Sequence, residues 1–576
     1  MLEKRYHPAQ YEAQIYRKWE QSGAFKPSEV ADGREAYTIV IPPPNITGNL
    51  HMGHALNNMV QDVLIRSKRM QGYDVLWQPG IDHASIATQM VVERQLAEQG
   101  LPDRRSMGRE AFLERVWQWK AISGGRIADQ LRRLGASCDW SRERFTMDAM
   151  LGRAVVEMFV RLHEQGLIYR AKRMLNWDPK METAISDLEV VQREVQGTLW
   201  RFAYPIKDDR EGARIPVATT RPETMLGDVA VAVNPHDPRY LHLIGRSCVQ
   251  PVTGRELIII ADDHADPEAG TGAVKITPAH DFNDFEVGKR HGLELVEIFD
   301  HHACLNENVP PAYQGLDRMK ARTKIIADMQ ALGAFLGEDA ITHSVPYGER
   351  GGVPVEPMVT DQWFVDCTSL AARAIESVKA GRTEFVPVGW DQNFFNWLEQ
   401  IEPWCISRQL WWGHQIPAWY GPDGQVFVGR DLAEAAKKAE AAYGEKVKLV
   451  RDPDVLDTWF SSALWPFSTQ GWPDKTEDFR RFYPTSVLVT GFDIIFFWVA
   501  RMMMAGLHLT DREPFHTVYV HALVRDEHGQ KMSKSKGNVI DPLSVIDRYG
   551  ADALRMTLCA LAAPGRDMRL SVDRVA

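Results

Sequence analysis

The sequence predicts an α/β protein in which a parallel-sheet domain is interrupted by a β-rich insertion and followed by helices. Strand–loop–helix units near the N-terminus, and again after residue 480, predict the parallel sheet. A change to short β-rich runs from about residue 195 predicts the insertion. The 576 residues are 44% apolar and 25% charged, which is a globular balance and excludes disorder and coiled coils.

The first two strand–helix units place two loops at one edge of the predicted sheet. Residues 37–41 form a β-branched and aromatic run, and helical periodicity follows to Met70. Residues 74–77 predict a second strand, and residues 84–99 a second helix. Parallel sheets bind ligands beyond the carboxyl ends of their strands. We therefore expect a ligand site between the loops at 42–50 and 79–83.

The insertion is expected over residues 195–345. Its predicted strands lie at 216–220, 229–233, 257–260 and 273–277, and its helices at 281–291 and 317–332. The α/β pattern resumes with a strand at 485–490, a helix from about 494 and a strand at 517–520. The expected domains are 1–194 and 346–530, which form one folded domain, the insertion at 195–345, and the beginning of a helical stem at 531–576.

Composition excludes several classes of protein. The net charge of −10 argues against a small basic module that coats nucleic acid. The six cysteines contain no CxxC pair, which excludes a cysteine zinc knuckle and is typical of a reducing cytosol. No apolar signal segment is visible at the N-terminus. The apolar run at 487–509 is interrupted by Asp493 and Arg501, which favours a buried strand and helix over a membrane span.

Two histidines begin the first predicted helix. His51 and His54 lie three residues apart and face one side, where free backbone N–H groups and the helix dipole suit a phosphate. Gly53 removes a side chain where a flat ligand such as a purine can press on the backbone. The alternative is a pair of surface histidines at a helix cap. Their place after a strand and a Pro/Gly loop favours the nucleotide site.

A second cluster, KMSKSKGN at 531–538, alternates lysines with small residues. Such a cationic loop can close on a polyphosphate and release it. The alternative is a solvated basic surface loop, which is disfavoured because the same domain already carries the sequence HMGH at 51–54.

The signatures HMGH at 51–54 and KMSKS at 531–535 together resemble the class I aminoacyl-tRNA synthetases. Within that class, PPPNITGNLHMGHA, NWDPKMETAISDLEV, ATTRPETMLGDVAVAVNP and VLDTWFSSALWPFSTQGWP are most similar to the valyl enzymes, and the resemblance covers nearly the whole chain. It implies a Rossmann-type catalytic domain with an inserted editing domain. It also implies activation of valine by ATP with Mg²⁺, transfer to tRNA(Val), and a monomeric, cytoplasmic enzyme.

The resemblance implies a role for specific residues of the synthetic site. Catalytic contacts to ATP and its phosphates are implied for His51, His54, Lys531 and Lys534, with Gly53 also at the nucleotide. Valine is implied to lie against Pro42, Asn45, Asp82, Trp459, Ile494 and Trp498, with Asp82 as the partner of its ammonium. Without the family, Trp459 and Ile494 fit an ordinary core equally well. Trp411, Trp412 and His414 are implied to support the nucleotide from below.

The inserted domain is expected to hydrolyse mischarged threonyl-tRNA(Val). An apolar pocket rejects an isostere with an added hydroxyl only weakly, and the discrimination of valine from threonine is the standard instance. Lys275 and Thr277 lie two apart on a predicted strand, and Asp281 and Asp284 three apart at a helix start, so each pair faces one side. The resemblance adds Arg221 and Thr224. One cation, two carboxylates and two hydroxyl donors are then available to a threonyl ester, although Asp281 also fits a simple helix N-cap.

Three features depart from the family pattern. Ile81 and Ser85 stand where the family usually has Thr and Gly. Some relatives carry cysteine pairs in the segments matching 178–181 and 348–351, where this chain has none, so no structural zinc is expected. Only 41 residues follow Ser535, so we expect residues 541–563 to begin a stem, the anticodon-binding and coiled-coil regions to be lacking, and tRNA charging to be weakened.

Two alternatives to a valine-activating enzyme remain. One is a stand-alone deacylase of threonyl-tRNA with a degenerate synthetic site, and the other is a non-catalytic tRNA-binding or regulatory paralogue. The presence of both signatures argues against each.

Overall fold

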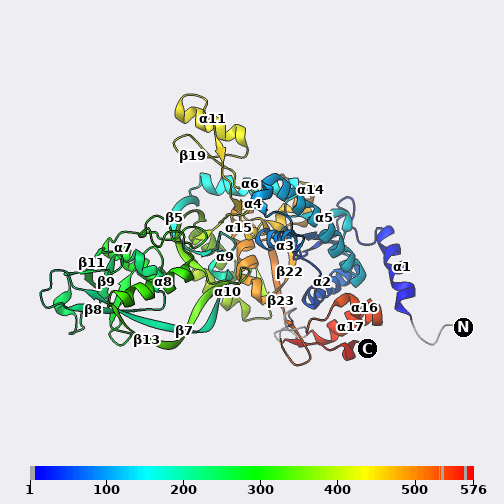
Figure 1. Cartoon of the computed structure of the whole chain (residues 1–576). Coiled ribbons are helices and arrows are strands. Elements are labelled where there is room, and N and C mark those ends of the chain that lie inside the picture. Colours follow the sequence, from blue (N-terminus) through cyan, green and yellow to red (C-terminus); the bar gives the residue numbers. More distant parts are fainter. Residues whose placement is uncertain (1–6, 531, 533–537, 563–566) are drawn as a thin grey trace. The chain divides into compact units, whose positions relative to one another are not determined.

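The computed structural model describes residues 7–530, 532, 538–562 and 567–576, and the chain divides into two compact units. Unit 1 comprises Met1–Tyr169 and Phe364–Ala576, so both halves of the chain build it (Figure 1). Unit 2 comprises Arg170–Trp363, and the insertion expected at 195–345 lies inside it. The chain passes between the units within β5 (Ile168–Asp178) and β14 (Glu356–Val365).

Unit 1 is centred on parallel strands. β1 pairs in parallel with β2, and three further strands form a parallel sheet in the order β15-β23-β22. β1 lies against β22, where the Thr38 N–H donates to Ser486 Oγ at 3.0 Å. These strands are β1 (Ala36–Val40), β2 (Asp74–Gln78), β15 (Glu384–Val386), β22 (Thr485–Gly491) and β23 (Phe515–His521). The parallel-sheet fold class expected from the sequence is confirmed.

The central strands are buried along their length, as expected of parallel strands covered on both faces. Every residue of β2 is buried, and Ile39, Val40, Leu76 and Trp77 are fully inaccessible. Helix α2 packs against β1, β2 and β22 with apolar residues that recur at helical spacing. The helices of unit 1 are α1 (Pro8–Gln21), α2 (Met52–Met70), α3 (Ser85–Glu98), α4 (Arg104–Met107), α5 (Arg109–Leu134), α6 (Ala149–Glu164), α9 (Thr368–Lys379), α10 (Trp390–Glu399), α11 (Leu432–Tyr443), α12 (Thr458–Ser462), α13 (Trp465–Ser468), α14 (Glu477–Phe482), α15 (Ala500–Thr510), α16 (Pro542–Tyr549), α17 (Ala551–Leu561) and α18 (Val572–Val575).

Short strands complete unit 1. They are β3 (Gly80–Ile81), β4 (Arg144–Phe145), β16 (Trp404–Cys405), β17 (Ser407–Arg408), β18 (Ala418–Tyr420), β19 (Val426–Val428), β20 (Val450–Arg451), β21 (Val455–Leu456), β24 (Val524–Arg525) and β25 (Met568–Arg569). β18, β19 and β20 join α11 around a small core that includes Trp419 and Phe427, and this part stands apart from the body of the unit (Figure 1).

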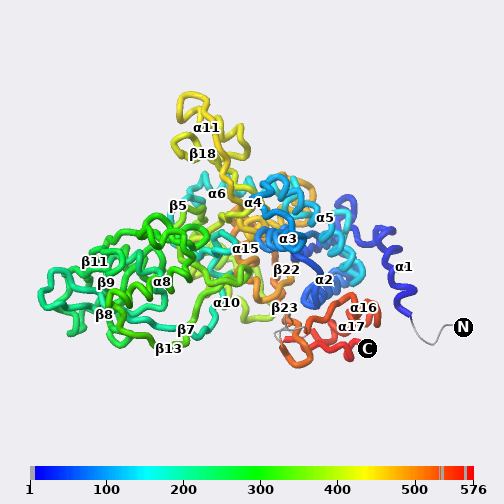
Figure 2. Tube along the Cα trace, viewed as in Figure 1, coloured from blue at the N-terminus to red at the C-terminus, as the bar shows by residue number. Residues whose placement is uncertain are grey.

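Helices near the two ends of the chain meet in unit 1 (Figure 2). The Glu12 carboxylate on α1 accepts the backbone N–H groups of Ala551 (2.9 Å) and Asp552 (3.2 Å), so it caps α17. The stem expected from residue 541 is helical over α16 and α17.

One stretch of the described chain, Phe492–Thr510, is long and apolar enough to cross a membrane by length and composition. Inside the protein 61% of its apolar window is buried, as in the core helix of a globular domain. The structure shows a strand, β22, running into this helical stretch.

Unit 2 contains two β-sheets around a core that includes Tyr204, Val231 and Ile259, together with most of a third sheet, β16-β14-β5-β6. One sheet has the order β10-β11-β9-β12 and the other β13-β7-β8. The elements are β6 (Thr183–Ile185), β7 (Val190–Pro205), β8 (Arg214–Thr219), β9 (Ala230–Val233), β10 (Ser247–Val249), β11 (Glu256–Ala261), β12 (Ala273–Ile276), β13 (Phe335–Gly348), α7 (Phe282–His291), α8 (Arg318–Ala331) and the 3₁₀ turns at Pro222–Gly227.

Candidate active site

The loops that follow β1 and β2 meet in unit 1. Asn45 and Asp82 lie opposite each other in an isolated parallel bridge. The Asp82 N–H donates to the Pro44 carbonyl (2.9 Å), and the Ile46 N–H donates to the Asp82 carbonyl (3.1 Å). Pro42 begins the first of these loops, directly after Ile41. The bridge therefore brings together two of the loops from which a ligand site was expected.

His51 and His54 form a reciprocal cap at the start of α2. His51 Nδ1 accepts the Gly53 N–H (3.1 Å), His54 Nδ1 accepts the His51 N–H (3.2 Å), and the two rings lie 4.0 Å apart. Because each Nδ1 accepts a hydrogen bond, the neutral form of each ring carries its proton on Nε2. Nε2–H donors at a helix N-terminus are suited to phosphate oxygens.

Gly53 has a second role in this cap. A Cβ at this position would lie 2.9 Å from His51 Cε1, so a side chain would displace the ring. Glycine therefore lets His51 fold back over the first turn of α2. The sequence had suggested only that Gly53 opens space for a flat ligand.

His521, at the end of β23, belongs to the same cluster and was missed by the sequence analysis. Burial lowers the pKa of His54 to about 3, with the nearby His51 and His521 adding to the shift. Burial also lowers the pKa of His521, whose Nδ1 lies 2.8 Å from the Ala522 carbonyl. The signal that could have found His521 is its position at the carboxyl end of a predicted parallel strand.

Asp82 is buried at the carboxyl end of β3, with an exposed fraction of 4%. Burial raises the pKa of Asp82 to about 7, opposed by hydrogen bonds from the Ala84 N–H (2.7 Å) and the Thr146 hydroxyl (3.5 Å) and increased by Asp457. A cationic group placed here would stabilise the carboxylate, because opposite charge favours the ionised form. Asp82 is thus a candidate partner for an ammonium.

Aromatic side chains of α12 and of the turn that follows β22 pack together in unit 1 and form an aromatic wall. Trp459, on α12, stacks on Phe497 with ring centroids 5.2 Å apart. Trp498 Nε1–H donates to the Ser462 carbonyl at the end of α12 (3.1 Å), and Ile494 lies just before the turn that carries Phe497 and Trp498. The predicted residues Trp459, Ile494 and Trp498 therefore lie on adjoining elements.

The departures Ile81 and Ser85 are accommodated by their neighbours. Ser85 Oγ lies 2.9 Å from His83 Nε2, so the added hydroxyl has a hydrogen-bond partner. Ile81 Cδ1 would lie 2.8 Å from a Cβ at Gly124, so that glycine makes room for it.

His83 packs against the segment 411–414, for which the resemblance implied a role in supporting the nucleotide. Trp412 Nε1–H donates to the His83 carbonyl (2.8 Å), and the His414 ring lies 5.2 Å from the His83 ring. Trp411, at the same turn, donates its N–H to Gln89 Oε1 (3.0 Å). Burial lowers the pKa of His83 well below its usual value and that of His414 to about 4, so both rings are neutral. Lys531 and Lys534 lie outside the described residues.

In unit 2, Lys275 and Thr277 face one side, as the strand spacing predicted. Lys275 Nζ donates to Thr277 Oγ1 (2.6 Å) and lies 3.3 Å from the Asp228 carboxylate. Asp228 also accepts the hydroxyls of Thr277 (2.7 Å) and Tyr204 (2.7 Å). The sequence analysis missed Asp228 and Tyr204, which come from distant segments.

Asp281 and Asp284 have different positions. Asp281 is the N-cap of α7, accepting the N–H groups of Asn283 (2.8 Å) and Asp284 (3.1 Å), as its alternative interpretation stated. Asp284 is buried, accepts the Thr277 N–H (2.8 Å) and lies 3.6 Å from His264 Nε2. The neighbouring Asp284 raises the pKa of His264. Of these two aspartates, Asp284 is therefore the one that contacts Thr277, whereas Asp281 caps the helix.

Arg221 is surrounded by acceptors. Its Nη1 donates to the His280 carbonyl (3.1 Å), and its guanidinium pairs with Glu223 (3.3 Å) and with Glu356. Although burial acts in the opposite direction, these two carboxylates raise the pKa of Arg221. Glu223 also pairs with Arg322 (2.7 Å). The arginine is thus charged and held in an ion-pair network, in which Glu356 also pairs with Arg318 (2.6 Å).

The two predicted hydroxyl donors require a correction. The Thr224 hydroxyl donates to the Arg221 carbonyl (2.9 Å), and the Thr277 hydroxyl donates to Asp228. A hydroxyl has one proton, so both oxygens offer lone pairs to a ligand instead of donors.

The segments that match the family's cysteine pairs also lie in unit 2. Asp178 Oδ1 accepts the N–H groups of Lys180 and Met181 (both 3.0 Å). A Cβ at Gly351 would lie 1.9 Å from Asp178 Oδ2, so the carboxylate occupies the space beside this glycine. Among the described residues, no group of three or more His, Cys, Asp or Glu side chains is arranged to hold a metal ion.

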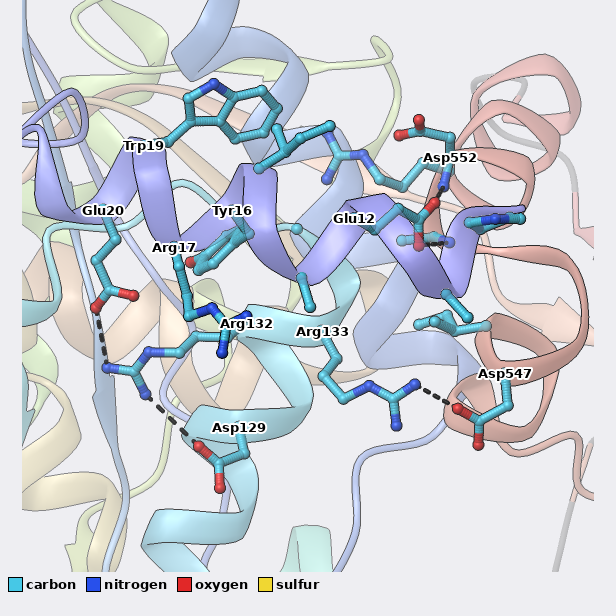
Figure 3. Close-up of a pocket in the computed structure, with 18 of the residues that line it drawn as sticks. Glu12, Tyr16, Arg17, Trp19, Glu20, Asp129, Arg132, Arg133, Asp547 and Asp552 are labelled. Atoms are coloured by element: carbon cyan, nitrogen blue, oxygen red, sulfur yellow. Dashed lines mark hydrogen bonds and ion pairs between the residues drawn. The ribbon is translucent and has the colours of Figure 1, made fainter. Parts of the chain in front are cut away.

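A separate cavity of about 960 Å³ lies between α1, α5 and the helices α16 and α17 (Figure 3). Two of its arginines are paired: Arg132 lies 3.5 Å from Glu20 and 3.9 Å from Asp129, and Arg133 pairs with Asp547. These matched charges join α1 and α5 to each other and to α16, and they are unlike the donor clusters of the candidate sites.

The family model of class I tRNA synthetases (I, L, M and V) matches residues 14–571. A valine--tRNA ligase of Brucella suis biovar 1 is 61% identical over all of this chain, which spans 66% of that relative's length. A valine--tRNA ligase of Rhodopseudomonas palustris is 59% identical over all of the chain, which spans 64% of its length.

A solved structure has the same fold. The Agrobacterium radiobacter K84 agnB2 LeuRS, in a ternary complex with tRNA and LeuAMS, aligns with a TM-score of 0.55 and 19% identity, over 99% of this chain and 74% of that one. With a family model that matches nearly its whole length, the chain belongs to the class I tRNA synthetases of the I, L, M and V group.

Proposed function

We propose that this chain carries the activating and editing parts of a valine--tRNA ligase. Asp82 carries the proposal: a buried carboxylate sits in one loop at the strand ends, bridged to the Asn45 loop that leads to the paired His51 and His54. The relatives named valine--tRNA ligases, at 61% and 59% identity, support valine as the amino acid.

In the proposed first step, the valine ammonium binds the Asp82 carboxylate and the side chain lies against Trp459, Ile494 and Trp498. A valine carboxylate oxygen attacks the α-phosphorus of ATP, the new O–P bond forms, and pyrophosphate leaves with its bonding electron pair. The Nε2–H groups of His51 and His54 donate to phosphate oxygens as negative charge develops there. Mg²⁺ enters with ATP, and Lys531 and Lys534 are proposed to contact the phosphates.

In the proposed second step, a ribose hydroxyl of the terminal adenosine of tRNA(Val) attacks the valyl carbonyl, and AMP leaves. Neither step needs a covalent enzyme intermediate, so orientation and preorganised charge supply the catalysis. Unit 2 is proposed to hydrolyse threonyl-tRNA(Val) at the cluster of Lys275, Thr277 and Asp284, with Arg221 and Thr224 beside it. Asp281 caps the helix that carries Asp284 and so positions it.

The test is amino-acid-dependent ATP–pyrophosphate exchange with valine, isoleucine, leucine, methionine and threonine. We expect exchange with valine, weaker exchange with threonine, and little with the three larger amino acids. Preference for isoleucine, leucine or methionine would contradict the assignment within the family. Absence of exchange with all five would favour a deacylase or a non-catalytic paralogue, and deacylation of threonyl-tRNA would separate those two.

A further inference from the structure

A π-helical turn carries part of the aromatic wall. Residues Ile495–Val499 form a π-helix between the 3₁₀ turn Phe492–Ile494 and α15. Such turns are uncommon and concentrate at functional sites, because the wider turn changes where side chains point and leaves carbonyls without their α-helical partners. Here the turn presents Phe497, which stacks on Trp459, and Trp498, which reaches α12.

Arg501 satisfies two carbonyls of this turn. Its Nη1 donates to the carbonyl oxygens of Phe496 (2.9 Å) and Phe497 (3.0 Å). The side chain is buried, with an exposed fraction of 4% for the residue. A buried arginine that bonds to backbone oxygens fixes the conformation of that backbone, because loss of the donor would strand both carbonyls.

Aromatic rings hold the guanidinium in place. Arg501 Cζ lies 4.4 Å from the centroid of Trp404, 5.7 Å from that of Trp397 and 5.9 Å from that of Phe497. Cation–π attraction at these distances is stronger when the cation is removed from water. In the sequence, Arg501 is one of the two charged residues, with Asp493, that interrupt the apolar run at 487–509. The sequence alone indicated no contact for its side chain.

The contacts of Arg501 extend through Trp404 to Trp459, on the α12 side of the aromatic wall. Trp404 Nε1–H donates to Asp457 Oδ2 (3.1 Å), and Asp457 Oδ1 accepts the Trp459 N–H (3.4 Å) at the start of α12. Arg501 thus contacts the turn that carries Phe497 and Trp498, and through Trp404 and Asp457 it is linked to Trp459.

We propose that Arg501 is a positioning residue that sets the width of the amino-acid pocket. It acts by locking the π-helical turn against Trp404, so that Trp459, Ile494 and Trp498 stand at a fixed separation. The inference rests on the proposed function, since it assumes that these residues line the amino-acid pocket. Arg501 itself makes no contact with the reacting groups in this assignment.

The experiment uses Arg501→Lys and Arg501→Ala in this chain, assayed by ATP–pyrophosphate exchange with valine and isoleucine. Displacement of a binding wall by about 1 Å costs up to about 100-fold, so we expect the KM for valine to rise about 10- to 100-fold in both variants. The KM for ATP should stay near that of the parent, and the preference for valine over isoleucine should fall. Added guanidinium should partly restore the KM for valine in Arg501→Ala and leave Arg501→Lys unchanged.

His508→Ala is the matched control, because His508 lies on the same helix α15 and contacts Gln165 (2.6 Å) instead of the π-helical turn. The control should keep the parent's KM for both substrates. An unchanged KM for valine in Arg501→Lys, or equal increases for valine and ATP, would overturn the positioning role. Loss of folding in both Arg501 variants would overturn it too, by assigning the residue to stability alone. A parent chain without valine-dependent exchange would instead refute the proposed function.

Discussion

The candidate sites of the two units differ in how their titratable side chains are charged before a ligand binds. In unit 1, burial leaves His54 neutral and raises the pKa of Asp82 to about 7, so these groups are uncharged or only partly charged before a ligand arrives. In unit 2, Lys275 is already paired with Asp228, and Arg221 with Glu223 and Glu356.

This difference indicates different modes of recognition. A ligand that brings an ammonium and phosphates gains most in unit 1, because its charges find buried donors and an ionisable carboxyl. In unit 2 the charged side chains already form ion pairs within the protein, so we expect a ligand there to be selected by the placement of acceptor oxygens such as those of Thr224 and Thr277. We therefore expect single substitutions to weaken the binding of a charged ligand more in unit 1 than in unit 2.

The largest expected effect is that of His54→Ala. Loss of one preorganised donor to the phosphates should lower valine-dependent pyrophosphate exchange about 10²- to 10³-fold. Deacylation of threonyl-tRNA should change little, because the proposed site lies in unit 2. His516→Ala removes an exposed imidazole near the amino end of the same β23 that ends at His521, and serves as the control. Comparable losses in both variants would remove the special role of His54.

The next effect tests unit 2. Asp284→Ala removes the carboxylate that accepts the Thr277 N–H, and deacylation of threonyl-tRNA should fall by about 100-fold through loss of orientation. Valine-dependent exchange should stay near that of the parent. Asp263→Ala, an exposed carboxylate in the same unit, should leave both activities intact. If Asp284→Ala clears threonyl-tRNA as fast as the parent, the editing site lies elsewhere.

A smaller effect concerns pH in unit 1. Only ionised Asp82 attracts an ammonium, and its pKa of about 7 lies above the usual carboxyl value. The KM for valine should therefore be level above pH 7 and rise about tenfold per pH unit below it, as the carboxylate takes up its proton. Steady-state exchange from pH 5.5 to 8.5 measures this, with the KM for ATP as the internal reference. A pH-independent KM for valine would separate Asp82 from the ammonium.

The smallest effect tests the cap. In Gly53→Ala the new Cβ would lie 2.9 Å from His51 Cε1 and displace the ring that caps α2. Loss of a cap costs about 1 kcal/mol. Gly125→Ala, within α5 and with open space around its Cβ, is the control and should stabilise the protein through helix propensity. Urea unfolding should place Gly53→Ala about 1 kcal/mol below Gly125→Ala, and equal stabilities would show that the ring adapts.

Much of the local structure follows from short-range pattern. The strand predicted at 74–77 is β2 (Asp74–Gln78), and the helix predicted at 84–99 is α3 (Ser85–Glu98). The helix predicted from about 494 differs, because a π-helical turn precedes α15. Apolar periodicity reports an approximate helix, whereas the turn depends on a donor, Arg501, and on the aromatic rings packed around it.

By itself, the sequence determined the helix start at which His51 and His54 lie and the strand end at which Asp82 lies, because β-branched runs, Pro/Gly loops and helical spacing are local properties of the chain. It also determined that Lys275 and Thr277 share a face, since side chains two apart on a strand point the same way. Only the tertiary structure decided which charged side chains are paired within the protein and which buried groups stay uncharged until a ligand binds. His521 and Asp228 join their clusters from distant segments, as does Trp404, which packs against Arg501. Burial, which shifts pKa values and makes pairing necessary, exists only after those segments have packed together.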